Sequence, residues 1–229
     1  MNYLERYQNG EYEQVWKELQ DLGASIRNEP YYTQAQEVAA ETMGRVRQNC
    51  ERIISRLHTL GYVFGTFPDG KRRSDRMPPH TLPSQKMQAE CDELDSEAGP
   101  LPLSLIAFWQ EVGAVDLVGM HPSWPHGLDP LVVDPPEGPL AELYEEDEEI
   151  FISLAPDEFH KDNISGGDPY GLELPNPAVD FMFMEERHEV LFVPYLRLAL
   201  LQWGGFPGLD GKGIQFEPLT SLTAELELF

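Results

Sequence analysis

One segment, GPLPLSLIAFWQEVGAVDLVG at residues 99–119, constrains the fold more than any other part of the chain. Only Glu111 and Asp116 are charged in it, and most of the other side chains are apolar. A stretch of this composition is stable only when other parts of the chain shield it from water. We therefore expect residues 99–119 to lie in the core as a folding nucleus and to carry no catalytic residue.

The order of residues within this segment predicts a helix followed by a strand. Pro100 and Pro102 lack a backbone donor and hold the chain extended ahead of the helix. The apolar residues between 103 and 112 suit a short helix that needs burial to persist, and Gly113 suits its end. The residues from Val115 onward then read as a buried strand.

The first 60 residues have helical periodicity. Apolar residues at 12, 15, 16, 19 and 22 share one helix face, and Gly23 follows them. A longer apolar stripe runs from Ala35 to Leu60, between Pro30 and Gly61, and includes Cys50, whose predicted role is packing. Two helices with so short a connection are expected to pack as an antiparallel hairpin.

After residue 65 the chain changes from helices to short strands. We read 1–65 as a helical hairpin prefix, 66–83 as a connector with prolines and a Lys-Arg-Arg run, and 84–229 as the main domain. That domain opens with a short helix, and turns separate its later elements, of which 191–205 is helical. The predicted fold class is α+β, with a mixed, mainly antiparallel sheet flanked by helices. Strands are expected at 129–134, 148–156, 170–175 and 178–184.

Charge is the most informative property of the composition, because 40 acidic side chains outnumber 16 basic ones. Residues 1–100 carry 12 basic and 16 acidic side chains, and residues 101–229 carry 4 and 24, so the net charges are −4 and −20. Such a surface repels nucleic acid and anionic lipid and attracts a basic protein. A charged start, two cysteines and the lack of a long apolar run predict a cytoplasmic protein with no membrane contact.

The helix and turn at 101–115 resemble the signature of the SUKH superfamily, which includes the Smi/Knr cell-wall regulators. Leu101-Pro102, Phe108-Trp109, Gly113 and Val115 take the places of that pattern, over a match of residues 84–229. The second turn residue, usually glycine, is Ala114 here, so it must fit without a positive φ. The resemblance implies an α+β fold and a protein-binding role as a toxin-immunity or regulatory protein, with no catalytic residue.

The candidate partner-binding residues are aromatic side chains in loops and a run of consecutive carboxylates. The aromatic side chains would supply affinity, and the acidic run would speed the encounter with a basic partner. These residues are Trp124, Tyr144, Glu145, Glu146, Asp147, Glu148, Glu149 and Tyr170. No cofactor is expected for this function.

Two other hypotheses compete with a non-enzymatic binding protein. The loop HPSWPHGLD brings His121, His126 and Asp129 close in sequence, as a metal-dependent hydrolase requires, and His160 is a possible addition. Alternatively, the hairpin at 1–65 mediates self-association and the protein is a scaffold; its oligomeric state is left open. The glycine-rich segment 204–213 lacks the spacing of a phosphate-binding loop and is read as a turn.

Overall fold

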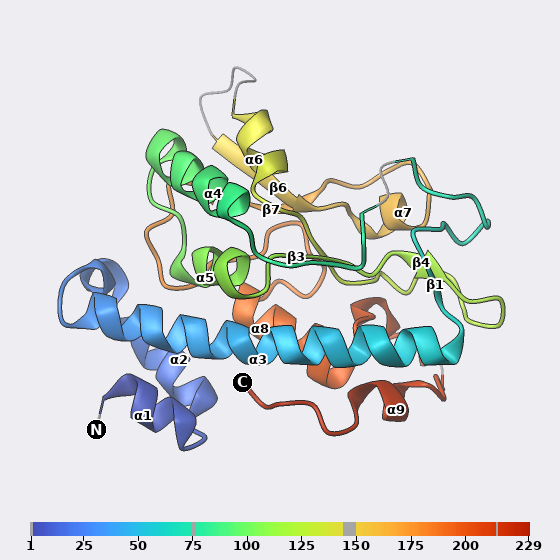
Figure 1. Ribbon diagram of the computed structural model, residues 1–229, viewed down its shortest axis with the longest axis horizontal. Coiled ribbons are helices and arrows are strands. Elements are labelled where there is room, and N and C mark those ends of the chain that lie inside the picture. Colours follow the sequence, from blue (N-terminus) through green and yellow to red (C-terminus); the bar gives the residue numbers. More distant parts are fainter. Residues whose placement is uncertain (1, 75–76, 144–149, 214) are drawn as a thin grey trace.

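A single long helix organises the molecule. In the computed structural model, which describes residues 2–74, 77–143, 150–213 and 215–229, the helix α3 (Tyr31–Leu60) crosses the full width of the protein (Figure 1). Its 30 residues span about 45 Å. The predicted apolar stripe is buried from Ala35 to Leu57, whereas Leu60 at its end is exposed, and Gly61 ends the helix in the left-handed conformation at φ 87°. No helix in the described part of the chain is both long and apolar enough to cross a membrane.

The apolar segment 99–119 lies against this helix, as expected of a folding nucleus. Helix α5 (Leu103–Glu111) packs along α3, and its Trp109 donates a 2.9 Å hydrogen bond from Nε1 to the carbonyl oxygen of Asp134. Gly113 follows with a φ of +92° and leads into strand β3 (Ala114–Asp116). Ala114 has no positive φ, so the prediction for this turn is confirmed.

The fold class α+β is confirmed, but the strands form three small antiparallel sheets. One has the order β2-β3-β5, and β1 pairs with β4 and β6 with β7. In the last pair Ile152 lies opposite Leu172, and the amide of Asp134 beside β5 donates 2.7 Å to the Leu154 carbonyl in β6. The remaining strands are β1 (Val63–Phe64), β2 (His80–Thr81), β4 (Gly119–Met120), β5 (Val132–Val133), β6 (Ile150–Ala155) and β7 (Tyr170–Leu174).

Short helices surround the strands and α3 (Figure 1). α4 and α6 lie on the side of the strands away from α3, and α1, α2 and α9 lie below α3 in the same view. Helix α1 is absent from the sequence prediction, although its N-cap Asn2 and Glu5 form a capping box. The helices are α1 (Tyr3–Gln8), α2 (Tyr12–Asp21), α4 (Gln85–Ala98), α6 (Glu137–Glu142), α7 (Glu158–Lys161), α8 (Phe192–Arg197) and α9 (Leu219–Thr223), with short 3-10 turns at Gly23–Arg27 and Pro207–Leu209.

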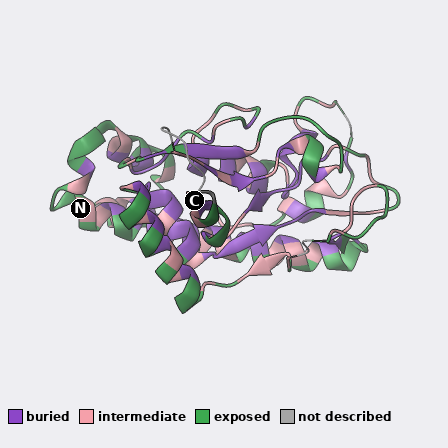
Figure 2. Cartoon of the chain, turned by 90° about the horizontal axis from the view of Figure 1, so that it is seen from above, coloured by how far each residue is buried: buried purple, intermediate pink, exposed green. Residues whose placement is uncertain are grey.

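One hydrophobic core includes the predicted prefix and the predicted main domain. Its buried side chains extend from Tyr7 in α1 to Phe229 in the C-terminal tail. Figure 2 shows this buried interior as a continuous zone beneath exposed outer helix faces. The connector 66–83 therefore does not divide two cores. Most of the apolar stripe of α3 is buried inside the same chain.

Two predicted elements in the C-terminal half differ from the structure. Residues 178–184 form isolated bridges, Gly171 with Met184 and Met182 with Leu191, where a regular strand was expected. The predicted helix at 191–205 consists of α8 followed by a π-helix, η2 (Leu198–Gln202). A buried carboxylate explains the first difference, because Asp180 accepts hydrogen bonds from the Ser104 hydroxyl at 2.8 Å and the Val193 amide at 3.1 Å.

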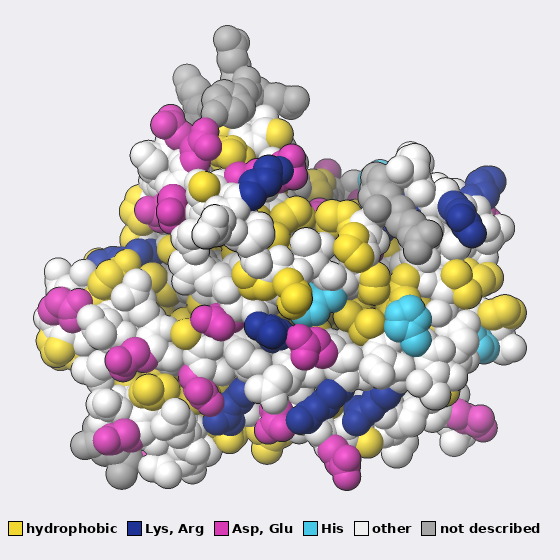
Figure 3. Space-filling view, in the orientation of Figure 1, with side chains coloured by type: hydrophobic (Ala, Val, Ile, Leu, Met, Phe, Trp, Pro, Cys, Tyr) yellow, Lys and Arg dark blue, Asp and Glu magenta, His cyan; other side chains and the backbone are white. Residues whose placement is uncertain are grey.

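The C-terminal tail is fixed to one face of α3 by side-chain contacts to its backbone. Asn49 donates to the carbonyl oxygen of Glu227 and accepts from the Glu227 amide, both at 2.8 Å. Arg45 donates to the Leu228 carbonyl at 2.9 Å, and Arg52 to the Glu225 carbonyl at 2.6 Å. Lys and Arg side chains are visible along this side of the molecule in Figure 3. We call residues 222–229 the tail strap.

Replacing Asn49 by alanine is expected to destabilise the protein by about 2 kcal/mol. The substitution removes two hydrogen bonds and leaves the backbone groups of Glu227 without their partners in a partly buried position. Urea denaturation measures this loss, and alanine at the neighbouring exposed Gln48 is the matched control, expected to change stability by less than about 0.5 kcal/mol. Equal stability of the two variants would show that the tail strap contributes nothing.

Candidate functional site

The predicted anchor residues lie in different environments. Trp124 is only partly exposed, since its ring packs against Tyr62, Phe206 and Phe216 at centroid distances of 5.3, 5.8 and 4.9 Å. Tyr170 is only 3% exposed, so its prediction as a surface anchor is wrong. Tyr144, Glu145, Glu146, Asp147, Glu148 and Glu149 lie outside the described residues.

The loop of the metal-dependent alternative does not assemble a ligand set. Among the described residues, no group of three or more His, Cys, Asp or Glu side chains is placed to hold a metal ion. His121 stacks on Trp124 with centroids 4.8 Å apart, and the carboxylate of Asp129 is turned inward to Lys161. His121 and Asp129 therefore serve separate contacts.

Asp129 and Lys161 form a fully buried ion pair. The Lys161 Nζ atom lies 2.8 Å from Asp129 Oδ1, and both side chains are 0% exposed. The Tyr170 hydroxyl donates to Asp129 Oδ2 at 3.3 Å, and Lys161 Nζ lies 4.6 Å from the centre of the Tyr170 ring. Burial, followed by the neighbouring Asp129 charge, raises the pKa of Tyr170 and keeps its hydroxyl protonated as a donor. This pair fixes helix α7 to the loop after β4.

Asp157 caps the N-terminus of helix α7. The Asp157 Oδ1 atom accepts from the amides of Phe159 at 2.7 Å and His160 at 3.1 Å, and its Oδ2 contacts the His160 ring at Nδ1. Burial alone would raise the pKa of Asp157, but these hydrogen bonds from His160 and Phe159 lower it. The carboxylate is therefore ionised, and it orients the imidazole.

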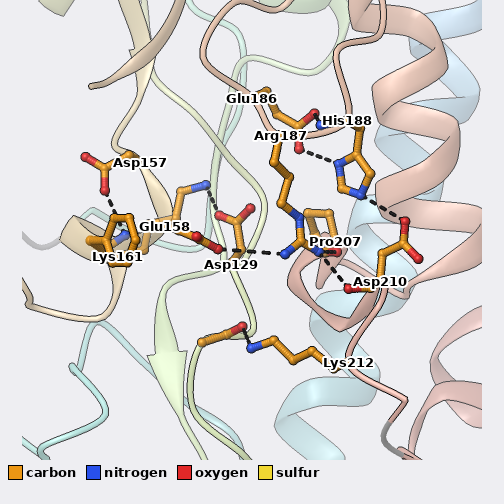
Figure 4. A network of polar contacts seen from close by, with 12 residues as sticks. Asp129, Asp157, Glu158, Lys161, Glu186, Arg187, His188, Pro207, Asp210 and Lys212 are labelled. Atoms are coloured by element: carbon orange, nitrogen blue, oxygen red, sulfur yellow. Dashed lines mark hydrogen bonds and ion pairs between the residues drawn. The ribbon is translucent and has the colours of Figure 1, made fainter. Parts of the chain in front are cut away.

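A network of polar contacts connects α7 to the loops around it (Figure 4). Arg187 donates to the carbonyl oxygens of Pro207 at 2.5 Å and Asp210 at 3.2 Å, and its Nη1 lies 3.8 Å from the Glu158 carboxylate. His188 contacts Glu186 at 2.5 Å and Asp210 at 3.2 Å. These contacts hold the loop at 182–191 against the loop at 207–212.

Each of the four cations in residues 101–229 is engaged in at least one contact within the chain. Lys161 pairs with Asp129, and Arg187 contacts Glu158 and two carbonyl oxygens. Lys212 donates to the carbonyl oxygens of His126 and Gly127, and Arg197 donates to that of Phe229. Acidic side chains exposed in this half of the described chain are Glu137, Asp168, Glu173, Glu185, Glu189, Glu217 and Glu225.

A cavity of about 720 Å³ lies beside α7. Its apolar lining includes Phe67, Val118 and Pro156, and Asp157, His160 and Ser165 contribute polar groups. Two large apolar side chains stand exposed at this position, Phe159 on α7 at 45% and Ile164, which also lines the cavity, at 55%. We call Phe159, Ile164 and this cavity the α7 face.

The acidic side chains at the α7 face belong to α7 and the residues after it, whereas a cation comes from the connector. Glu158 lies on α7 and Asp162 and Asp168 follow it in sequence, while on the connector Arg73 pairs with Asp116 at 2.6 Å. Arg73, the last residue of the Lys-Arg-Arg run, thus contacts an acidic residue of the following domain. The α7 face thus combines exposed apolar side chains, which are typical of the contact centre of a protein interface, with charged groups of both signs, because Arg73 and Lys161 also line the cavity.

The Asp157–His160 pair gives this cavity an oriented imidazole. Aspartate and histidine in this relation occur in hydrolases, where the second ring nitrogen takes a proton from a nucleophile. Ser165 lines the same cavity, but no hydrogen bond joins its hydroxyl to His160 in the described part of the chain. The described residues therefore provide a positioned base without an activated nucleophile.

Sequence reasoning missed Phe159 and Ile164. Asp157 followed by helix-compatible residues indicates a capped helix. This pattern does not indicate which side chains of the helix are exposed. Compared with known protein families, with curated proteins and with solved structures, the chain matches none of them.

Proposed function

We propose that this chain is a non-enzymatic protein-binding module of the cytoplasm that masks a cationic partner protein, as a toxin-immunity or regulatory protein does. The observation that carries the proposal is the α7 face. Phe159 and Ile164 are exposed there, within a half of the chain whose cations are all engaged in internal contacts. The resemblance of residues 101–115 to the SUKH signature points to the same class of function.

The acidic half and the α7 face have different tasks in this proposal. Exposed carboxylates outnumber the cations of this half of the chain, so they draw a basic partner toward the surface and raise the association rate, an effect that salt screens. An exposed ion pair contributes at most about 1 kcal/mol, so charge alone does not hold a complex. Burial of Phe159 and Ile164 against the partner supplies the rest.

The buried Lys161–Asp129 pair prepares the surface for binding. Because α7 is fixed before the partner arrives, little conformational entropy is lost when Phe159 and Ile164 are buried. Asp157 adds to this by capping the helix. Occlusion of the partner, without a reaction, is sufficient for this mechanism.

Replacing Phe159 and Ile164 together by alanine is expected to weaken partner binding by about thirtyfold or more, because paired apolar anchors dominate interface energies. Proteins retained from the native cell at about 0.1 M and about 1 M salt identify the partner, and titration of the purified pair then gives the Kd. Tyr31→Ala is the matched control, since Tyr31 is also an exposed aromatic residue, 37% exposed, and it is the first residue of α3, a helix that begins at the other end of the molecule from α7 (Figure 1).

Three outcomes decide between the possibilities. Retention of one basic protein by the native chain and Tyr31→Ala, with loss from the double variant, supports the proposal. Equal retention by the double variant would refute the assignment of the α7 face. Retention of no protein at either salt concentration contradicts the function itself.

A further inference from the structure

His188 lies between two carboxylates, one at each ring nitrogen (Figure 4). Its Nδ1 atom is 2.5 Å from Glu186 Oε1, and its Nε2 atom is 3.2 Å from Asp210 Oδ2. Glu186 belongs to the loop at 182–191, and Asp210 belongs to the loop at 207–212. The side chains of His188 and Glu186 are 10% and 0% exposed, so water has little access to the contact between them. We call these three side chains the His188 clasp.

The clasp is complete only when His188 carries a proton on both ring nitrogens. A carboxylate oxygen accepts a hydrogen bond, so each contact needs an N–H group; the neutral imidazole has one and the imidazolium has two. The contact with Glu186 is the one retained when a proton leaves, because the His188 amide also donates to Glu186 Oε2 at 2.8 Å. Asp210, whose side chain is 43% exposed, is then faced by a ring nitrogen that carries no proton.

Glu186 needs the positive charge of His188. Burial raises the pKa of Glu186 and the nearby charge of Asp129 adds to this, whereas the hydrogen bonds from His188 lower it. A buried carboxylate without a counter-charge is costly. The ionised Glu186 and the protonated His188 therefore stabilise each other.

The other described cations around the clasp have partners of their own. Lys161 pairs with Asp129 at 2.8 Å. Arg187 Nη1 lies 3.8 Å from the Glu158 carboxylate, and Arg187 Nη2 donates to main-chain oxygens of the loop at 207–212. The carboxylates that flank the clasp in sequence, Glu185 and Glu189, are exposed. The imidazolium is thus the cation that balances Glu186.

The loop held by the clasp lies on the segment that carries Asp129. The Gly208 amide donates to the Leu128 carbonyl at 2.9 Å, and a Cβ atom added at Gly208 would lie 2.3 Å from the carbonyl carbon of Leu128. Lys212, at the end of the loop, donates to the main-chain oxygens of the two residues before Leu128. The loop therefore covers the segment from which Asp129 reaches its buried partner, and the clasp holds the loop between these two points.

We propose that the His188 clasp is a proton-operated latch on the loop at 207–212. With the imidazole protonated the latch is closed, and the loop is held against the Asp129 segment. Histidine changes its charge between about pH 5 and about pH 8. As the pH rises through this range the bond to Asp210 is lost and the loop opens more often, so the closed state belongs to the acidic side. The latch does not depend on the proposed partner.

Hydrogen exchange of the amides at 208–210 tests the latch, with each rate divided by the intrinsic rate at the same pH. The amides of Gly208 and Asp210 donate to the carbonyls of Leu128 and Pro207, so their protection reports how often the loop opens. We expect protection in the native chain to be about tenfold lower at about pH 8 than at about pH 6, because one charge-assisted hydrogen bond is lost. Nitrogen-15 NMR of the His188 ring is expected to show both nitrogens protonated at the lower pH.

Two variants separate the latch from general effects of pH. His188→Gln cannot change its charge, so its loop is expected to have the same low protection at both pH values. Asp210→Asn supplies an amide, which accepts from the charged ring and donates to the neutral one, so protection is expected to be kept at both. His126→Gln is the matched control, because His126 is exposed and contacts Lys212 through its main-chain oxygen; it is expected to keep the native pH dependence.

Three results would overturn the proposal. One is equal protection of the native loop at the two pH values, and another is a neutral His188 ring at about pH 6. The third is a native pH dependence in either His188→Gln or Asp210→Asn. Asp210→Asn decides the question if His188→Gln does not fold, because the Asp210 side chain is partly exposed and tolerates an amide of the same shape.

Discussion

Replacing Gly113 by alanine is expected to destabilise the protein by about 3–5 kcal/mol. A Cβ atom added at Gly113 would lie 2.1 Å from the carbonyl oxygen of Thr81 and 2.9 Å from the Pro83 nitrogen, and backbone atoms cannot rotate away. Its φ of +92° adds conformational strain of about 1–2 kcal/mol for any residue with a side chain. The clash would separate β2 from β3 beside the core helix α5.

Two matched glycines separate the clash from the strain in the same urea-denaturation experiment. At Gly10 φ is also positive, +98°, but no atom lies within 4 Å of the added Cβ, so alanine there is expected to cost only about 1–2 kcal/mol. Gly44 lies within α3 and has open space, so alanine there is expected to stabilise by about 0.5–1 kcal/mol. If Gly113→Ala lowered the free energy of unfolding no more than Gly10→Ala does, this result would contradict the close approach of the Thr81 carbonyl in β2 to Gly113.

Breaking the Lys161–Asp129 pair is expected to have a similarly large effect. Lys161→Met leaves a buried carboxylate without a counter-ion, and Asp129→Asn leaves a buried ammonium, so each is expected to cost about 3–5 kcal/mol. The double variant has no unpaired charge and is expected to be more stable than the sum of the single effects predicts. Asparagine is chosen because it tolerates the φ of +46° at this position.

The exposed pair Arg47–Glu51 is the control for this double-mutant cycle. Its side chains are 43% and 47% exposed, so Glu51→Gln is expected to change stability by less than about 0.5 kcal/mol. Because α7 depends on Lys161, the Lys161→Met variant is also expected to lose partner binding under conditions where it is still folded. A cycle with additive single effects would falsify the interpretation of this pair as a coupled unit.

The elements that could be predicted from the sequence are those with a strong local signal. Helix α3 has an apolar stripe and a terminal Gly61, and the segment 99–119 has prolines, an apolar helix and Gly113 in order. The bridges at 178–184 could not be predicted from the local sequence. Asp180 accepts hydrogen bonds from Ser104, which lies 76 residues earlier, and from Val193, which belongs to α8. The apolar run AVDFMFM between turns indicated a strand and gave no sign that its one carboxylate is buried.

The candidate site was less predictable than the fold. Tyr170 reads as a loop aromatic in sequence, but its hydroxyl is needed by Asp129, 41 residues earlier, and this contact buries the ring. The exposure of Phe159 follows from the burial of Lys161 two residues later on α7, and that burial depends on the ion pair with Asp129. Such exposure is set by tertiary contacts, and no local pattern encodes it.

The tail strap has a consequence for how the chain is made. Asn49 leaves the ribosome 178 residues ahead of Glu227, the residue that completes its hydrogen bonds. At about 5–20 residues per second, translation exposes this face of α3 for on the order of 10–40 s before its intramolecular cover exists. Nascent chains are therefore vulnerable to chaperone capture or aggregation at this face until residues 222–229 have emerged, and docking of the tail strap completes the cover of α3.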